Sequence, residues 1–306
     1  MRVIIGGGSG FVGRELTRLL RGKGHEVTLI SRHAGPDRIT WEDLDTGGLP
    51  PCEGAVNLAG ENLMNPLRWW NESYKQDLFS SRIDTTRALA RAIGSAPTPP
   101  RSWVLVTGVA CYRPSPTALY TEDSDWTPFD LLSQLTGGDQ ARGGAGAGRG
   151  AMRQMLTPFW LGLGGPLGSG QQPFPWIHVS DLAGIIAHSL ECPTAPPSGR
   201  DGPEVLNGVA PALDTNREFT GALGRALRRP TLFPVPGFVL RALMGAERAV
   251  VLTEGQRVEP KRTLETGYQY QYPHLQAALE EIVGSNRPES PGVSLCLGGE
   301  EVKAEF

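Results

Sequence analysis

The sequence predicts an α/β fold built on a doubly wound parallel sheet, with a small C-terminal lobe. Short runs of apolar, β-branched residues alternate with segments of helical periodicity, and these runs contain few polar positions. Strands of that composition are buried on both faces, as in a parallel sheet that helices cover from each side. Hydrophobic residues make up 39% of the 306-residue chain, which is enough to form a sizeable core.

The first half of the chain contains the clearest elements. Four strands are expected, at Arg2–Ile5, Glu26–Ile30, Ala55–Leu58 and Trp103–Thr107. Leucines at helical spacing follow the first strand as far as Gly22 and Gly24, which end that helix. A long helix is expected over Asn71–Ile93, because Pro97 and the prolines after it prevent its continuation.

The second half has a weaker pattern. We expect one or two helical turns at Phe129–Leu135, strands at Trp176–Val179 and Val205–Val209, and helices ending at Leu190, over Asn216–Leu227 and near Leu275–Val283. Ser180 or Asp181 is expected to cap the first of these later helices, and Asp214 or Thr215 the second. The expected domains are residues 1–165 for a nucleotide-binding unit and 166–283 for a substrate lobe, followed by a tail at 284–306 without periodicity.

Charge and cysteine content exclude several classes of protein. A formal net charge of -3 argues against a nucleic-acid-binding protein that depends on bulk positive charge. The four cysteines are far apart in sequence, so neither a disulfide scaffold nor a metal site is expected. No apolar run approaches the roughly 18 residues of a membrane span. Met1 leads directly into a strand, so we expect a cytoplasmic protein that does not bind membranes.

A glycine-rich turn after the first strand carries the strongest functional signal. Gly7, Gly10 and Gly13 fit G-x-x-G-x-x-G between a strand and a helix. In a Rossmann-type fold such glycines permit a tight turn, close approach of a pyrophosphate and packing of the helix on the strand. The candidate cofactor-binding residues of this turn are Gly7, Ser9, Gly10, Phe11, Val12 and Gly13. The alternative is a glycine-rich turn with no ligand.

The end of the second strand indicates which cofactor is bound. An acidic residue at this position would bind the ribose 2′-hydroxyl of NAD. Ser31 and Arg32 occupy it here, and they can hydrogen-bond a 2′-phosphate with charge assistance. The pattern therefore predicts NADP, whereas a solvated surface arginine is the alternative interpretation of Arg32.

The third strand ends in small residues. Leu58, Ala59 and Gly60 would allow the cofactor ribose to lie against the backbone at the carboxyl edge of the sheet. Simple close packing explains these residues equally well.

Several motifs together resemble a known family. The runs GGGSGFVG, AVNLAGEN, SRIDTTRAL, VTGVACY, PWIHVSDLAG and VLNGVAP are similar to the atypical extended short-chain dehydrogenase/reductases, and within them to the NAD(P)-dependent nucleotide-sugar epimerase-like family. The run RTLETGYQYQYPHLQAALEEIV resembles the C-terminal domain of that family. By this resemblance Asp77 and Arg82 lie near the cofactor, although a helix-surface ion pair is the alternative.

The resemblance weakens at the catalytic residues. The superfamily uses a Ser or Thr together with Y-x-x-x-K, in which the ammonium lowers the pKa of the phenol for proton transfer. None of the six tyrosines has a lysine four residues later. Thr107 resembles the Ser/Thr position loosely, and Tyr112 corresponds to a non-catalytic tyrosine. His178 and Asp181 match a superfamily motif, but helix capping is the interpretation we prefer for Asp181.

A glycine-rich run departs from the family pattern. Residues 137–150, GGDQARGGAGAGRG, stand where the family has a helix and a strand. A loop is expected there, and the loss of a buried strand predicts a marginally stable chain.

These observations predict an NADP-dependent oxidoreductase or epimerase-like protein. Its substrate would be a small molecule with a hydroxyl or carbonyl group, with a nucleotide-sugar as the candidate class, and Phe174–Trp176 opposite Gly168–Gly170 as a candidate pocket wall. The alternative is a catalytically impaired NADP-binding sensor or interaction protein, which the missing Y-x-x-x-K favours.

Overall fold

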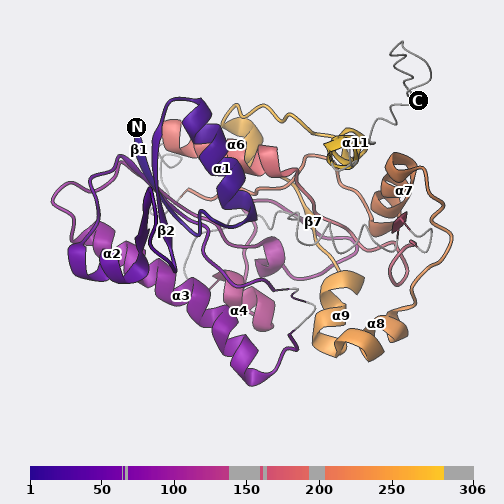
Figure 1. Cartoon of the computed structure of the whole chain (residues 1–306). Helices are drawn as coiled ribbons and strands as arrows, with labels where there is room; N and C mark the ends of the chain where they lie inside the picture. Colours follow the sequence, from indigo (N-terminus) through magenta and orange to yellow (C-terminus); the bar gives the residue numbers. More distant parts are fainter. Residues whose placement is uncertain (64, 66–67, 138–158, 161–163, 193–203, 286–306) are drawn as a thin grey trace, which may run out of the picture.

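The structure, a computed structural model, describes the whole chain except residues 64, 66–67, 138–158, 161–163, 193–203 and 286–306. A parallel sheet with helices on both faces forms one side of the molecule, and a second unit of short helices lies beside it (Figure 1). The glycine-rich run beyond Gly137 and nearly all of the predicted tail lie outside the described residues. Among the described helices, none combines the length and the apolar character needed to cross a membrane.

The sheet is parallel throughout and has the strand order β3-β2-β1-β4-β5. Its strands are β1 (Arg2–Gly6), β2 (Glu26–Ser31), β3 (Arg38–Thr40), β4 (Gly54–Asn57) and β5 (Ser102–Leu105). β1 lies in the middle, where Ile5 is in register with Leu29 of β2 and Val56 of β4. The order of the strands reverses between β1 and β4, and such a reversal opens a crevice at the carboxyl edge. The predicted doubly wound sheet is therefore confirmed.

Helices cover both faces because β1 is apolar on both. Val3 and Ile5 pack with residues of α1 and α6 on one face, whereas Ile4 packs with Leu44 of α2 and Leu89 of α3 on the other. These helices are α1 (Phe11–Gly22), α2 (Trp41–Gly47), α3 (Glu72–Gly94) and α6 (Val179–Glu191). Figure 1 shows α1 and α6 on one side of the sheet and α2 and α3 on the other.

The second unit, called the C-terminal unit from here on, has its own core. α7 and α11 pack together through Phe219, Leu223 and Leu279, and Trp176 joins this cluster. The remaining described elements are η1 (Val109–Cys111), β6 (Leu119–Tyr120), α4 (Leu131–Gly137), α7 (Asn216–Leu227), α8 (Gly237–Met244), α9 (Ala246–Thr253), β7 (Arg257–Val258), α10 (Lys261–Glu265) and α11 (Leu275–Ser285). The parallel pair β6 and β7 links the segment that follows β5 to this unit.

Two predicted strands are wrong. Trp176–Val179 is not a strand, because α6 begins at Val179 and the preceding residues run between the two cores. Val205–Val209 is not a strand either, since the backbone N–H of Asn207 donates to the Glu122 carboxylate instead of to a neighbouring strand. The four strands predicted in the first half are confirmed to within two residues, whereas β3 and α2 were not predicted.

The predicted caps are half right. Thr215 caps α7 in a capping box with Glu218, as one of the two alternatives proposed. α6 is instead capped by His178, whose ring nitrogen Nδ1 accepts the N–H of Ser180 at 3.2 Å. The prediction that Ser180 or Asp181 caps this helix is therefore wrong.

Asp181 anchors the C-terminal unit. Its fully buried carboxylate accepts the backbone N–H groups of Gln271 at 2.7 Å and Tyr272 at 2.9 Å, and the Tyr268 hydroxyl donates to it at 3.1 Å. A buried charge requires such donors to offset its lost hydration. Asp181 therefore fixes the chain around residues 268–272 against the start of α6.

The packing of α1 gives a first prediction. A Cβ atom at Gly13 would lie 2.5 Å from the Cα atom of Gly8, so Gly13→Ala must push the helix away from the turn. We expect a loss of about 1–3 kcal/mol in the free energy of unfolding, measured by urea denaturation. Gly22→Ala is the control in the same helix, because a Cβ atom there meets nothing within 4 Å in the described structure. It should leave stability unchanged or raise it by up to about 1 kcal/mol. Equal effects of the two substitutions would contradict this account of Gly13.

Candidate functional site

The glycine turn meets the segment after β4 at the carboxyl edge of the sheet. Gly7 has a φ of 73°, and a Cβ atom there would lie 2.7 Å from the backbone nitrogen of Ala59. The N–H of Gly7 donates to Ile30 O at 3.1 Å, and the N–H of Gly10 donates to Gly7 O at 2.9 Å. The turn is thus held between the ends of β2 and β4, where only glycine fits at position 7.

The N-terminus of α1 is open. Gly10 is its N-cap residue and offers no side-chain cap, and the first turn contains no acidic residue. The first N–H groups of a helix have no partner within the helix, so those around Phe11, Val12 and Gly13 can bind an anion. Arg14 reinforces the positive potential, since its Nη1 donates to Ser9 O at 2.8 Å. Sequence reasoning missed Arg14, although a basic residue directly after the third glycine was visible.

Gly10 differs from the other two glycines of the motif. A Cβ atom at Gly10 would approach only Gly7 O among the described atoms, at 3.1 Å. The fold therefore requires glycine less strictly here than at Gly7 or Gly13. The missing side chain leaves space directly over the start of α1.

Ser31 and Arg32 follow β2 beside this turn. The Ser31 hydroxyl donates to His33 O at 2.5 Å. Arg32 is exposed, and its side chain makes no hydrogen bond or ion pair with the part of the chain that the structure describes. The end of β2 therefore presents a guanidinium and a hydroxyl rather than a carboxylate.

The residues after β4 are held rigidly. The N–H of Leu58 donates to Gly6 O at 2.8 Å, and the N–H of Ala59 donates to Asn57 Oδ1 at 3.0 Å. Asn57 is buried and donates in turn to Thr86 Oγ1 at 3.0 Å on α3. Sequence reasoning gave Asn57 no positioning role, although one amide side chain ending an apolar strand is a visible signal.

Arg82 lies directly beside Gly60. Its guanidinium donates to Leu78 O and Glu61 O, each at 3.0 Å, and its carbon Cζ would be 3.0 Å from a Cβ atom at Gly60. Burial lowers the pKa of Arg82, although an arginine remains charged. Arg82 therefore supports the segment after β4, while its contact with a cofactor stays a prediction.

Asp77 lies on the same helix as Arg82, but its side chain makes a different contact. Its carboxylate pairs with Arg68 at 2.8 Å, and its side chain is 48% exposed. This contact favours the surface ion pair that the sequence left open for Asp77.

Thr107 and Tyr112 flank the short helix η1 after β5. Thr107 is half-buried and lies two residues after the end of β5, at the carboxyl edge, and its role as the Ser/Thr residue stays a prediction. Tyr112 is buried, and its hydroxyl lies 3.0 Å from Thr121 O and 3.1 Å from Asn207 Oδ1. Its ring stacks on Tyr120 with a centroid distance of 5.0 Å. The Tyr112 side chain is therefore engaged in packing and hydrogen bonding within the fold.

The described tyrosines with shifted pKa values all shift upward. Burial is the first cause for each of them: Tyr74, Tyr268, Tyr270 and Tyr272. The negative charge of Asp181 raises the pKa of Tyr268 and Tyr270 further. None of these four is a phenol activated for proton transfer near neutral pH.

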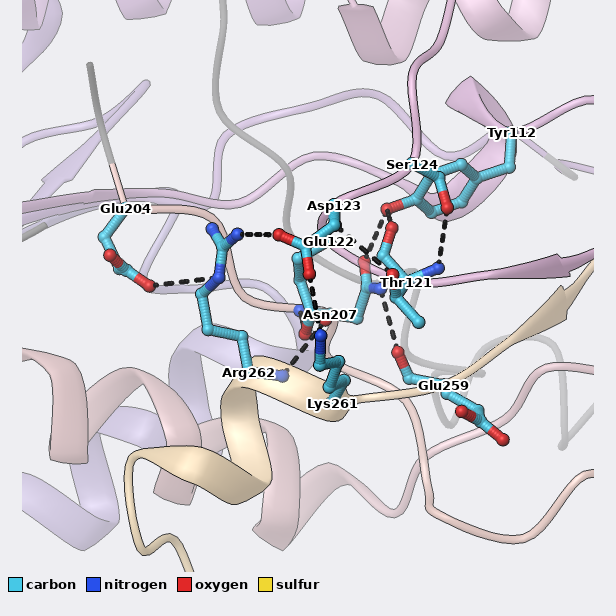
Figure 2. A network of polar contacts seen from close by, with 10 residues as sticks. All are labelled: Tyr112, Thr121, Glu122, Asp123, Ser124, Glu204, Asn207, Glu259, Lys261 and Arg262. Carbon is cyan, nitrogen blue, oxygen red and sulfur yellow. Dashed lines mark hydrogen bonds and ion pairs between the residues drawn. The ribbon is translucent and has the colours of Figure 1, made fainter. Parts of the chain in front are cut away.

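A polar network joins the segment after β5 to the C-terminal unit (Figure 2). Glu122 is buried, and its carboxylate accepts the N–H of Asn207 at 2.8 Å and the N–H of Arg262 at 3.1 Å. Asn207 also donates through Nδ2 to Glu259 O at 3.0 Å. Three segments distant in sequence therefore meet at Glu122 and Asn207, and the motif VLNGVAP has a structural role.

The adjacent Asp123 adds ion pairs to this network. Its two carboxylate oxygens contact Lys261 at 3.0 Å and Arg262 at 2.5 Å. Hydrogen bonds from Lys261 and then Arg262 lower the pKa of Asp123. On its other side, Arg262 Nε lies 3.7 Å from Glu204.

A cavity of about 220 Å³ lies in the C-terminal unit. Phe174 and Pro175 line it, as proposed for a pocket wall, but the facing residues come from Ala212–Glu218 and Gln256–Val258. Gly168–Gly170, the predicted partner wall, do not line this cavity. The reason is the antiparallel bridge between Pro173 and Thr215, which turns this segment toward α7.

Comparison with known proteins places the chain in a family. A family model described as a domain of unknown function (DUF1731) matches residues 235–282. Epimerase family protein SDR39U1 of Bos taurus is 56% identical over 300 residues, covering 92% of this chain and 100% of that protein. The chain belongs to the SDR39U1 epimerase family. The resemblance to nucleotide-sugar epimerase-like proteins is confirmed.

Solved structures agree with this assignment. The crystal structure of human SDR39U1 (isoform 2) with NADPH has a TM-score of 0.85 and 53% identity, covering 93% of this chain and 99% of that chain. A nucleoside-diphosphate sugar epimerase from Corynebacterium glutamicum has a TM-score of 0.64 and 25% identity, covering 95% of this chain and 62% of that chain. The predicted Rossmann-type fold is thus confirmed.

The buried carboxylate of Glu122 gives a second prediction. Both of its oxygens accept N–H groups, so Glu122→Gln must turn an amide donor toward one of these donors. We expect a loss of about 1–3 kcal/mol in unfolding free energy, measured by urea denaturation.

Asp123→Asn is the matched control for Glu122→Gln. It removes the same charge one residue later, from a side chain that is 38% exposed, and should cost clearly less stability than Glu122→Gln because solvent screens its ion pairs. A larger loss for the Asp123 variant would show that the ion pairs dominate the network.

Proposed function

We propose that the chain binds NADPH along the carboxyl edge of β1, β2 and β4. The observation that carries the proposal is the open N-terminus of α1, which faces the space over Gly10 and has neither a side-chain cap nor an acidic residue in its first turn. A pyrophosphate carries the negative charge that such a helix end favours. The NADPH bound to the human relative supports the same assignment.

The end of β2 supports NADP rather than NAD. A 2′-phosphate beside Arg32 would gain charge-assisted hydrogen bonds, and the Ser31 hydroxyl could turn from His33 O to donate another. A carboxylate at this position would repel that phosphate. Leu58, Ala59 and Gly60 line the neighbouring strand end, where a ribose would lie against backbone.

The proposed reaction is hydride transfer between the nicotinamide and a carbon that bears a hydroxyl or carbonyl group. The cofactor supplies the redox chemistry, and the chain binds and orients the substrate. Thr107 is the candidate side chain for a hydrogen bond to the substrate oxygen, because it follows β5 at the same edge. Membership in an epimerase family supports a small-molecule substrate, with a nucleotide-sugar as the proposed class.

A second candidate function is NADPH binding without turnover. The raised pKa values of Tyr74, Tyr268, Tyr270 and Tyr272 favour it, because a general acid works best with a pKa near the working pH. A chain of this kind would report the redox state of the NADP pool or bind a partner in response to it.

Cofactor choice gives a third prediction. At equal concentration, NADPH should raise the Tm more than NADH, because tighter binding to the native state stabilises it by mass action. Arg32→Asp should reverse the order, and each tenfold change in Kd corresponds to about 1.4 kcal/mol. Arg101→Asp is the control, since it makes the same charge change just before β5, at the opposite edge of the sheet. Equal shifts with both cofactors, unaffected by Arg32→Asp, would rule out the role of Arg32.

Turnover gives a fourth prediction and separates the two candidate functions. Incubation with NADPH and a panel of carbonyl compounds, keto-sugar nucleotides included, should consume NADPH above the rate without substrate. Thr107→Ala should lower kcat by about 10-fold or more while the Kd for NADPH stays unchanged. Tight NADPH binding with neither NADPH consumption nor epimerisation of the sugar nucleotides in the panel would establish the second function instead.

A further inference from the structure

The part of the C-terminal unit that matches the domain of unknown function, residues 235–282, contacts the segments that follow β4 and β5 at the carboxyl edge of the sheet. Arg248 of α9 reaches the segment between β4 and α3, and Lys261 and Arg262 of α10 reach the segment after β5. Both segments start beside the proposed cofactor site. Contacts with the C-terminal unit can therefore determine the position of their backbones.

Arg248 makes the more direct of these contacts. Its side chain is buried, and Nη1 donates to Arg68 O at 3.1 Å while Nη2 donates to Asn65 O at 3.2 Å. The two carbonyls belong to a segment 180 or more residues earlier in the chain. The planar guanidinium holds two acceptors in one fixed geometry, whereas the three donors of a lysine ammonium rotate on a shorter side chain and fix no such arrangement.

The same segment is already supported from α3. Tyr74 is fully buried, and its hydroxyl donates to Asn62 O. The Arg68 guanidinium lies 4.4 Å over the Tyr74 ring. With α3 on one side and Arg248 on the other, the backbone at Asn65 and Arg68 is held between the two units of the molecule.

A second link joins α3 and α9 directly. Lys75 of α3 pairs with Glu247 of α9 at 3.1 Å, next to Arg248 in sequence. Glu247 is 62% exposed, so solvent screens this pair and it contributes little to stability. The buried Arg248 contact is therefore the one expected to determine the position of the segment.

We propose that the C-terminal unit positions residues at the edge of the cofactor site, and that Arg248 is the positioning residue for the backbone at Asn65 and Arg68, between β4 and α3. The domain of unknown function would then serve to position residues beside the cofactor site. A buried polar contact fixes one arrangement of the backbone, whereas an apolar contact would permit several. The coupling between NADPH binding and Arg248 rests on the function proposed above. The contact of Arg248 with the backbone of Asn65 and Arg68 does not.

Hydrogen exchange of the full chain tests whether Arg248 fixes the backbone at Asn65 and Arg68. Relative to the wild type, Arg248→Met should speed exchange at least tenfold in peptides that contain Asn65 and Arg68. Arg248→Lys, which keeps the charge and can reach one carbonyl, should give an intermediate rate. Arg241→Met is the control, because Arg241 is exposed on the neighbouring α8. Wild-type rates in Arg248→Met, or equal acceleration across the whole chain in both Arg248 variants, would overturn the proposal.

Addition of NADPH tests the coupling. In the wild type, saturating NADPH should slow exchange in peptides covering Gly7–Gly13 and also in those covering Ala246–Thr253. In Arg248→Met the first effect should persist and the second should disappear, which a merely structural role would not produce. Protection of Ala246–Thr253 that survives the substitution would overturn the coupling. If NADPH protects nothing in the wild type, the proposed function fails, and the exchange rates without cofactor still decide the role of Arg248.

Discussion

The carboxyl edge of the sheet depends on a backbone contact that leaves no room for a side chain. Gly7 adopts a left-handed conformation, and a Cβ atom there would fall 2.7 Å from the backbone of Ala59. This contact sets the turn against β4 and brings the start of α1 over the strand ends. The anion-binding end of the helix, the small residues after β4 and the basic residue after β2 are neighbours because of it.

Buried carboxylates provide the corresponding constraint in the C-terminal unit. Asp181 and Glu122 each accept two backbone N–H groups from segments far away in the sequence. Hydrophobic contacts alone would hold α7 and α11 together, but they would not fix the path of the irregular chain around residues 259–272. Each carboxylate loses its hydration on burial, so the arrangement is stable only when all its donors are in place. Both units of the molecule thus depend on backbone groups held at defined positions.

The sequence predicted those parts of the fold that depend on neighbours in the chain. The apolar strand β1, the glycine turn and the leucines of α1 follow from local periodicity and glycine spacing. Asp181 was misjudged because an acidic residue in the first turn of a helix is a common local signal for capping. Its real partners lie at residues 268–272, and the acceptors of Arg248 lie at residues 65 and 68. No pattern within a helix or a strand predicts such pairs.

The same long-range contacts bear on catalysis. Tyr74, Tyr112, Tyr268 and Tyr270 all direct their hydroxyls to carbonyl or carboxylate oxygens inside the protein. A phenol with a carboxylate neighbour resists ionisation, because the second negative charge would be repelled. The hydroxyls of these tyrosines therefore serve as hydrogen-bond donors within the fold. The proposed cofactor site, in contrast, is built from backbone groups, glycines and arginines that need no such residue. The proposed cofactor binding therefore does not depend on an activated tyrosine, whereas the proposed turnover requires a proton donor from elsewhere in the chain.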